Sequence, residues 1–258
     1  MTSFEWIAAI YLAAVAATGR RTAQWRRGVL FAGGAVVLVI VARFTLPWEA
    51  RAWMPHIYLV LGYWIPALFT SAAVNQGFEG WLARTDRRLN VGSLVGSWRL
   101  GLGDLEVAYL LCYPLVPATF SIVFLLGDAR DVAHFWVAVL LAGYACYGTL
   151  PWTAARPPRV IARDEHARRG IAKLNTAVLG RVSHNLNTFP SGHVAVSLAA
   201  ALSVWPVHPA AGAVFLLAAT AIAIAAVAGR YHYLVDVLAG IPVGILAWLT
   251  PFLEAARF

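Results

Sequence analysis

Charged residues are scarce in this chain, and their scarcity excludes most soluble folds. Of its 258 residues, 60% are hydrophobic and only 12% are charged, which is about half the ~25% charged fraction of a typical soluble domain. The two cysteines, Cys112 and Cys146, each lie within an apolar segment, so the sequence offers neither a disulfide framework nor a cysteine metal site. We therefore expect a polytopic membrane protein.

Long apolar stretches are abundant. Measured against the ~20 residues that a helix needs to cross a bilayer, they give seven or eight candidate spans and predict an all-α transmembrane bundle. The candidates are 4–18, 28–46, 55–74, 107–127, 134–154, 191–206, 209–229 and 232–252. No repeat and no Pro/Gly/Ser-rich linker divides the chain, so we predict a single integral membrane domain over residues 1–258.

The basic residues alternate between the connections. The formal net charge is +8, but these residues stand between apolar runs, which argues against a nucleic-acid partner. Sixteen of the 20 Lys and Arg residues fall in the alternate connections at 19–27, 84–99 and 156–181 and at Arg230. The positive-inside rule makes these connections cytoplasmic. We expect the lipid bilayer as a partner and the bacterial inner membrane as the location.

Two connections are too long to be simple turns. Residues 75–105 place Trp81 beside Arg84 and Arg87, and residues 155–188 interleave apolar residues at helical spacing with basic ones. Both compositions are typical of a helix that lies in the membrane interface. A lipid-facing surface helix and a segment that grips a lipid headgroup are both compatible with this pattern.

A first polar motif begins the apolar run at 191–206. Pro190 fits the first turn of a helix, and the free N–H groups of such a terminus form an anion site that Ser191 would join. Gly192 allows close approach of a phosphate, and His193 is placed to donate a proton to a leaving oxygen. A turn with a satisfied histidine is the alternative interpretation of these four residues.

A second motif begins the apolar run at 232–252. His232 and Asp236 are four residues apart, so on a helix they share a face and Asp236 can accept the Nδ1 proton of His232. This pairing would present Nε2 of His232 as a nucleophile. A structural salt bridge between Asp236 and Arg230 is the alternative.

Together these residues resemble the type 2 phosphatidic acid phosphatase (PAP2) superfamily. The family pattern contains Lys-x6-Arg-Pro, then Pro-Ser-Gly-His, then Ser-Arg-x5-His-x3-Asp. The second part matches at residues 190–193, and His232 and Asp236 match the third part. Arg156 and the proline after it stand where the first part is expected. The resemblance covers roughly residues 107–250 and implies a catalytic core there, preceded by N-terminal spans and an interfacial segment at 1–106.

Two cations of the family pattern are missing. Thr149 stands in place of the Lys of the first part, and Ala226 in place of the Arg of the third part. Arg230 lies four residues after Ala226, which is one turn along the same face if the helix runs through. The sequence around these motifs is similar in style to the branch that includes inositol phosphorylceramide synthases, which transfer headgroups.

The resemblance implies roles for the matched residues. His232 would attack phosphorus and form a phosphohistidine, Asp236 would orient it, and His193 would act as acid and then as base. The phosphate would be held by Arg156, Ser191, Gly192 and Arg230. Arg159 and His184 are weaker candidates, and neither a metal ion nor a cofactor is implied.

Three functional classes stay open at this point. A lipid phosphatase that hydrolyses a phosphomonoester or diphosphate lipid uses every matched residue and is our first prediction. A phosphotransferase that passes a phospho-headgroup to a polar acceptor uses the same residues. A non-catalytic transporter or scaffold of the same fold is the third class. For the two enzymes the expected partner is a phosphorylated lipid substrate.

Overall fold

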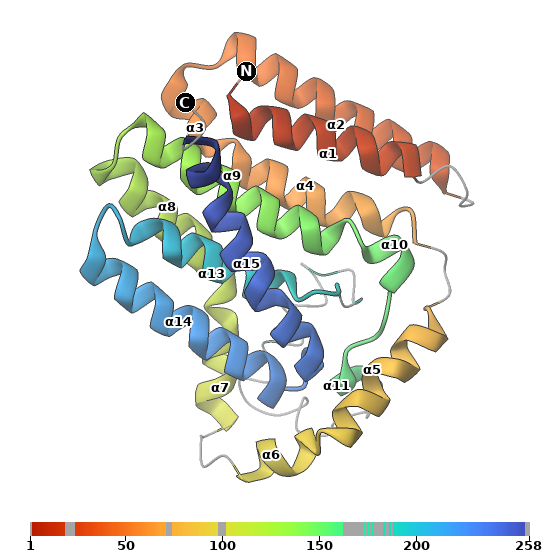
Figure 1. Cartoon of the computed structure of the whole chain (residues 1–258). Helices are drawn as coiled ribbons and strands as arrows, with labels where there is room; N and C mark the ends of the chain where they lie inside the picture. The colour runs from red at the N-terminus through yellow and green to blue at the C-terminus, as the bar shows by residue number, and fades with distance from the viewer. Residues whose placement is uncertain are drawn as a thin grey trace.

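A computed structural model shows the chain as a bundle of helices (Figure 1). It describes residues 2–18, 24–70, 74–97, 102–161 and 188–255, with residues 173, 175, 177, 183 and 186. Within these residues the regular structure is helical and contains no β-strand, which confirms the predicted all-α class. The helices are α1 (Ser3–Thr18), α2 (Trp25–Thr45), α3 (Trp48–Trp53), α4 (Pro55–Ala67), α5 (Gln76–Arg88), α6 (Val91–Ser97), α7 (Leu102–Leu110), α8 (Cys112–Leu126), α9 (Ala129–Tyr147), α10 (Leu150–Thr153), α11 (Pro158–Ile161), α13 (Gly192–Val204), α14 (Pro209–Ala228) and α15 (Leu234–Ala255).

Each predicted apolar stretch corresponds to helical structure, although three of them differ in detail. The stretch 134–154 is divided between α9 and α10, which begins at Leu150. The stretch 55–74 is helical only to Ala67, and the stretch 107–127 is divided between α7 and α8 at Leu111. Pro114 explains the division, because a proline has no N–H to donate to the carbonyl four residues back and its ring clashes with that carbonyl.

The helices differ in whether they are long enough to cross a bilayer. Within the described residues, three helical stretches are long and apolar enough to cross a membrane: Trp25–Thr45, Ala129–Thr153 and Pro209–Ala228. Shorter apolar helices are Ser3–Thr18, Cys112–Leu126, Gly192–Val204 and Leu234–Thr250. The exact number of spans therefore stays a prediction.

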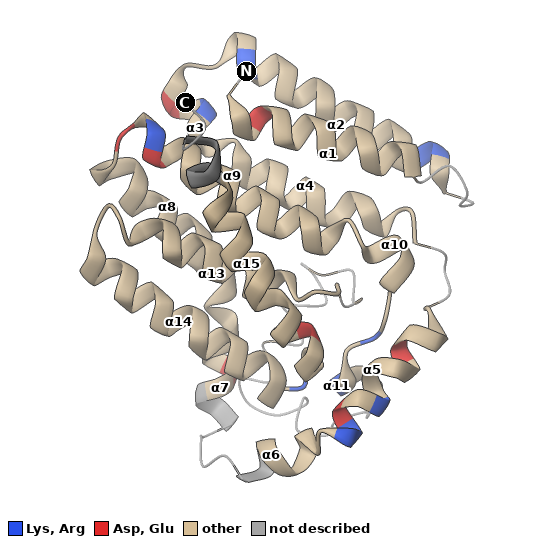
Figure 2. Ribbon diagram, in the orientation of Figure 1, with Lys and Arg blue, Asp and Glu red and all other residues tan. Residues whose placement is uncertain are grey.

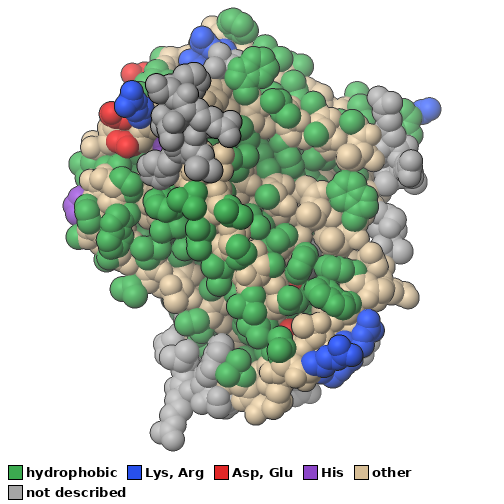
Figure 3. All heavy atoms as spheres, viewed as in Figure 1, with side chains coloured by type: hydrophobic (Ala, Val, Ile, Leu, Met, Phe, Trp, Pro, Cys, Tyr) green, Lys and Arg blue, Asp and Glu red, His purple; other side chains and the backbone are tan. Residues whose placement is uncertain are grey.

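The outer surface of the bundle is apolar between two charged ends. Large side chains such as Phe44, Leu30, Leu125 and Leu217 are more than two-thirds exposed, and hydrophobic atoms cover much of the face in Figure 3. Charged residues gather at the top of the bundle, at the right-hand end where α2 begins and around α5 at the lower right, while the middles of α9, α13 and α14 carry none (Figure 2). Exposure of so much apolar surface to water is unfavourable, whereas the hydrocarbon core of a bilayer can cover it. The fold is that of a membrane protein.

The core forms where α9, α13 and α15 pack together. On α9, Phe135, Trp136 and Leu140 are fully buried, whereas α13 contributes mainly small residues. Small residues let helices in a membrane approach closely. Gly240 on α15 shows how close this approach is, because a Cβ there would lie 2.8 Å from the carbonyl oxygen of Ser191. The start of α13 and the first turns of α15 are thus held together by packing.

The predicted interfacial segment at 75–105 forms α5, α6 and the start of α7. Asn75 begins α5: its side-chain oxygen accepts the N–H of Phe78 at 3.0 Å, and its side-chain nitrogen donates to the carbonyl of Trp152 at 2.9 Å. These bonds fix the start of α5 against α10, at the same end of the bundle as the start of α15 (Figure 1). Most of the second predicted segment, 155–188, lies outside the described residues.

Candidate active site

His232 and Asp236 lie together at the start of α15. The sequence predicts that both are on the helix, but α15 begins at Leu234, so His232 precedes it and only Asp236 lies in its first turn. The pairing itself is present: Nδ1 of His232 lies 3.4 Å from Oδ2 of Asp236, and both side chains are buried. The same oxygen accepts the backbone N–H of Tyr233 at 3.2 Å. The carboxylate that caps the start of α15 therefore also lies beside the histidine.

His193 approaches His232 from the other side. Nε2 of His232 and Nδ1 of His193 are 3.4 Å apart. If Asp236 accepts the Nδ1 proton of His232, Nε2 carries a lone pair, and His193 must be the donor in this contact. The contact leaves no room for a phosphoryl group between the rings, so a substrate must separate them. His193 is partly exposed and His232 is not, so we expect His193 to move.

The surroundings of His232 suit a nucleophile. Its side chain is buried, and a low-dielectric environment favours the uncharged imidazole. A neutral imidazole keeps the lone pair that attack at phosphorus requires.

The Pro-Ser-Gly-His segment is placed differently from the expectation. Pro190 precedes the helix, α13 begins at Gly192, and Ser191 occupies the N-cap position. The N–H of Ser191 donates to the backbone carbonyl of Asp236 at 3.0 Å, which ties the two motifs together. The buried hydroxyl of Ser191 has no hydrogen-bond partner among the described residues and so is available to a ligand.

Gly192 has a packing role in the structure. Its N–H donates to the hydroxyl of Thr188 at 3.3 Å, and a Cβ at this position would lie 2.4 Å from the ring of Tyr147. The absence of a side chain therefore makes room for Tyr147. Contact of Gly192 with a phosphate stays a prediction.

The segment that carries Arg230 and His232 is a turn, whereas the sequence predicts a continuous helix there. The helix does not run through to Arg230, because α14 ends at Ala228 and residues 229–233 form a turn. The carbonyl of Ala226 accepts the N–H groups of Tyr231 and His232, each at 2.9 Å. Arg230 itself has a left-handed backbone with φ of 57°, which is uncommon for a non-glycine residue. Ala226 thus holds the turn through its backbone, and Arg230 projects from it.

Thr149, which stands in place of the family Lys, also has a structural role. Its hydroxyl lies 2.7 Å from the carbonyl of Cys146 and 2.6 Å from the carbonyl of Phe189. Phe189 directly precedes the Pro-Ser-Gly-His segment. Thr149 therefore joins the end of α9 to the start of the first motif and does not replace the missing charge.

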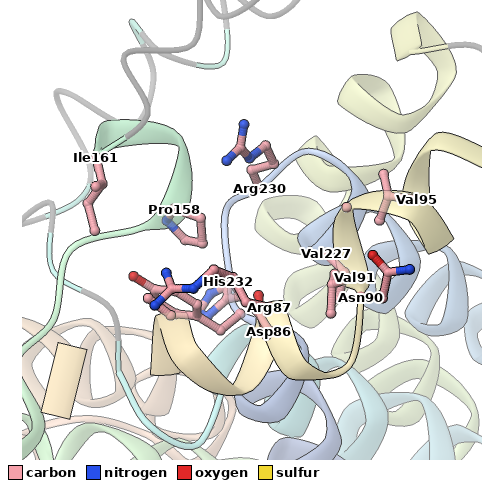
Figure 4. A pocket seen from close by; sticks show the side chains of 13 residues that line it. Asp86, Arg87, Asn90, Val91, Val95, Pro158, Ile161, Val227, Arg230 and His232 are labelled. Carbon is pink, nitrogen blue, oxygen red and sulfur yellow. The ribbon is translucent and has the colours of Figure 1, made fainter. Parts of the chain in front are cut away.

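A cavity of about 630 Å³ opens beside His232. Its polar border includes Arg230, together with Asp86 and Arg87 from α5 (Figure 4). Burial raises the pKa of Asp86 to about 6, although the N–H of Leu234 donates to its carboxylate at 3.1 Å and acts against this shift. The cavity offers a space in which a phosphorylated group can reach His232.

Arg156 is not part of that border. Its guanidinium donates from Nε and Nη2 to the two carboxylate oxygens of Glu79, at 3.0 and 2.7 Å, and its backbone N–H donates to the same carboxylate. The hydrogen bonds with Arg156 lower the pKa of Glu79. The backbone carbonyl of Arg156 accepts the hydroxyl of Tyr233 at 3.2 Å. Arg156 thus fixes α5 beside the site, and its binding of phosphate stays a prediction.

Arg159 is also engaged elsewhere. It is buried, with its guanidinium 4.1 Å from the ring centroid of Tyr231 and 3.8 Å from Glu106. The Tyr231 hydroxyl donates to the same carboxylate, and the ring of Tyr109 stacks on Tyr231 at 3.6 Å. Since Tyr231 precedes His232, this cluster positions His232. A direct role of Arg159 toward phosphate has no support in this arrangement.

The sequence does not indicate that residues of α5 contribute to the site. Glu79 and Asp86 carry no motif, and Arg87 counted only as one of several interfacial charges. Their spacing of seven and eight residues places them on one side of a helix, which is a signal that gains meaning only once α5 is known to lie against the site.

His184, a weaker candidate, lies outside the described residues. Among the described residues, no group of three His, Cys, Asp or Glu side chains could hold a metal ion.

Comparison with known proteins agrees with this geometry. The family model described as the PAP2 superfamily matches residues 103–250, which is more than half of the chain. A PA-phosphatase related-family protein of Dictyostelium discoideum is 49% identical over 65 residues, which are 25% of this chain and 12% of that protein. No solved structure matches the chain significantly. The likeness to the inositol phosphorylceramide synthase branch stays a prediction. The extent of the family match, over the region that supplies both histidines and Asp236, shows that the chain belongs to the PAP2 superfamily.

Proposed function

We propose that the protein is a lipid phosphatase of the membrane that works through a phosphohistidine on His232. The observation that carries this proposal is the alignment of three side chains. Asp236 lies on the Nδ1 side of His232, His193 lies on the Nε2 side, and both contacts are 3.4 Å long. Membership in the PAP2 superfamily supports a phosphatase-like function.

The reaction follows from this alignment in two steps. In the first step Nε2 of His232 attacks phosphorus and forms an N–P bond, while the bond to the lipid oxygen breaks and His193 gives that oxygen a proton. Asp236 accepts the Nδ1–H of His232 and stabilises the positive charge that grows on the ring. In the second step His193 takes a proton from water, the resulting hydroxide oxygen attacks phosphorus, and the N–P bond breaks to release phosphate.

The charge of the phosphoryl oxygens must be balanced during both steps. Arg230 lies on the border of the cavity beside His232, and the unpartnered hydroxyl of Ser191 lies in the adjoining motif. The proposal assigns these two groups to the phosphoryl oxygens. In this scheme the arginine supplies the positive charge, and no metal ion takes part.

The surroundings of the cavity support a lipid as the substrate. Val91, Val95, Ile161 and Val227 border the cavity on its apolar side, and the neighbouring helices expose large apolar side chains. A lipid can keep its tails against such a surface while its phosphate enters the cavity. We propose a phosphomonoester or diphosphate lipid.

Transfer to an alcohol is the second candidate, and one observation favours it. Asp86 and Asn90 border the cavity together with His232, and a carboxylate and an amide are good partners for hydroxyl groups of a polar acceptor. Labelled lipid phosphate should be incubated with and without a polyol or lipid alcohol. A new labelled lipid that forms only with the acceptor establishes transfer, and equal phosphate release in both reactions establishes hydrolysis.

The test of the mechanism is His232→Ala in detergent. We expect no turnover and no labelled protein after a short reaction with 32P-labelled lipid phosphate and an alkaline quench, which preserves phosphohistidine. His208→Asn is the matched control: His208 caps α14 at the other end of the bundle, asparagine also caps helices, and its activity should equal that of the wild type. Undiminished phosphate release by His232→Ala would refute the mechanism.

We propose further that the site faces the cytoplasm of a bacterial inner membrane. The support is the excess of Lys and Arg in the connections at the same end of the bundle. Single cysteines at Arg84 on α5 and at Arg130 on α9, in a chain without Cys112 and Cys146, report the two ends. In sealed right-side-out vesicles an impermeant thiol reagent should label only the second. Labelling of the first alone would reverse the orientation.

A further inference from the structure

We propose that Arg87 on α5 is a second phosphate-binding cation of this site, acting beside Arg230 on the phosphoryl group of the substrate. The inference rests on the proposed function, because it concerns the same cavity. It assigns to the N-terminal part of the chain a direct role in substrate binding, although the family match covers only residues 103–250. The ligand class is a phosphate-type anion.

Few positively charged side chains are available where the reaction needs them. Neither Thr149 nor Ala226 carries a charge, and each has a structural role in place of the family cation. Arg156 donates from two nitrogens to Glu79, and Arg159 is buried against Glu106 and Tyr231. If Arg230 were alone, one positive charge would face a phosphate that carries up to two negative charges.

Three contacts along α5 fix this helix next to His232. Glu79 binds Arg156, as described above, near the start of the helix. One turn further, Leu82 is fully buried against Ala155 and Tyr233. Another turn further, Asp86 accepts the N–H of Leu234, the first residue of α15. The residue that follows Asp86 is therefore held at the segment that carries the nucleophile.

Arg87 itself lies where a phosphate could reach it. Its side chain borders the cavity that His232 and Arg230 also border (Figure 4). The residue is exposed, and no hydrogen bond or ion pair joins its guanidinium to any part of the chain that the structure describes. Asp86, the neighbouring carboxylate, is directed to the N–H of Leu234. Arg87 thus presents a free guanidinium in the cavity.

The chemistry of the group fits this position. A guanidinium offers parallel N–H donors that match two oxygens of a phosphate, and it stays charged at any pH at which the protein is folded. Asn90, which has φ of 51°, ends the α5 segment and turns the chain so that Val91 and Val95 on α6 also border the cavity. The α5–α6 segment therefore supplies a cation and an apolar wall to one side of the substrate.

The experiment measures binding without turnover. It uses the full-length His232→Ala protein in detergent, alone and combined with Arg87→Gln, Arg87→Lys or Arg88→Gln. Arg88 is the matched control, because it is exposed on the same helix and does not border the cavity. Affinity is measured by calorimetry for two ligands, inorganic phosphate and a short-chain lipid phosphomonoester, and a thermal melt of each variant reports folding.

Loss of a charge-assisted hydrogen bond weakens binding by about tenfold or more. We expect Arg87→Gln to weaken both ligands by this factor, Arg87→Lys to restore part of the affinity, and Arg88→Gln to bind as the parent does. An equal loss in Arg88→Gln would overturn the inference, since it would show a general effect of net charge. A loss for the lipid alone would overturn it as well, because Arg87 would then contact another part of the lipid.

The proposed function fails in a different way. If the phosphohistidine mechanism is wrong, His232→Ala turns over substrate, whatever Arg87 binds. If only the present inference is wrong, His232→Ala is inactive and Arg87→Gln binds both ligands with unchanged affinity. Turnover and affinity therefore separate the two proposals.

Discussion

The backbone of Arg230 allows its charge and its conformation to be tested separately. A non-glycine residue in the left-handed region costs about 1 kcal/mol or more, and Arg230 has φ of 57°. Arg230→Ala removes the guanidinium and keeps this strain, whereas Arg230→Gly removes both. Relief of this strain should make the glycine variant about 1 kcal/mol more stable than the alanine variant. Part of this gain is offset, because glycine loses more conformational entropy than alanine when the chain folds.

For a chain of this size, 1 kcal/mol corresponds to a shift of about 2–4 °C in Tm. A thermal melt in one detergent should therefore place Arg230→Gly up to a few degrees above Arg230→Ala. Both variants should lose activity equally, because a lost donor to a developing oxyanion lowers the rate by about 10²-fold. The measurement is kcat/KM for a soluble short-chain lipid phosphate. Wild-type activity in either variant would refute the role of Arg230, and a lower Tm for the glycine variant would refute the strain.

Three other changes test how the site is held. Gly192→Ala should lower Tm by several degrees in a thermal melt, because overpacking typically costs about 1–3 kcal/mol and the new Cβ would lie 2.4 Å from Tyr147. Tyr231→Phe should lower both Tm and kcat, because it removes a donor to the buried Glu106 carboxylate; an unchanged kcat would contradict its positioning role. Asp86→Asn should raise the free energy of unfolding at pH 7.5 by an amount on the order of 1 kcal/mol, measured as a higher Tm, and this gain should shrink as the pH falls through about 6.

The sign of the Asp86 effect follows from linkage. The pKa of Asp86 in the folded protein is about 6, above its ordinary value of 3.8, so between these values the folded state binds the proton more tightly than the unfolded state. The wild-type protein therefore loses stability as the pH rises through this window. Asparagine does not titrate and still offers an oxygen to the N–H of Leu234. A gain in Tm that grows toward lower pH would contradict this account.

The sequence predicts the parts of this site that depend on residues close together in the chain. The apolar runs predict the helices because burial in a bilayer requires continuous apolar length. His193, His232 and Asp236 could be named because each belongs to a motif whose chemistry needs those residue types. The structure brings Asp236 and His232 together in a different way from the predicted shared helix: Asp236 reaches His232 from the first turn of α15, and His232 lies before the helix.

The parts that the sequence does not predict depend on contacts between distant segments. Nothing in the sequence around Glu79 indicates that it pairs with Arg156, 77 residues away, because neither charge has a local partner that would mark it. The same holds for Glu106, which lies 125 residues from Tyr231. The interfacial composition of α5 was visible in the sequence, but a surface helix and a wall of the active site have the same composition. Only the fold distinguishes them.

These long-range contacts suggest how the site works with a reduced set of family cations. In the family pattern the Lys and Arg belong to the motifs themselves. Here the turn at Arg230 is held by the carbonyl of Ala226, and α5 is held by Glu79 and Asp86. Both devices use backbone or carboxylate contacts to direct an arginine into the cavity beside His232. Glu79→Ala removes a carboxylate that anchors α5 but does not itself border the cavity. This variant should therefore weaken the binding of phosphate through Arg87. Wild-type phosphate affinity in Glu79→Ala would show that α5 needs no such anchor.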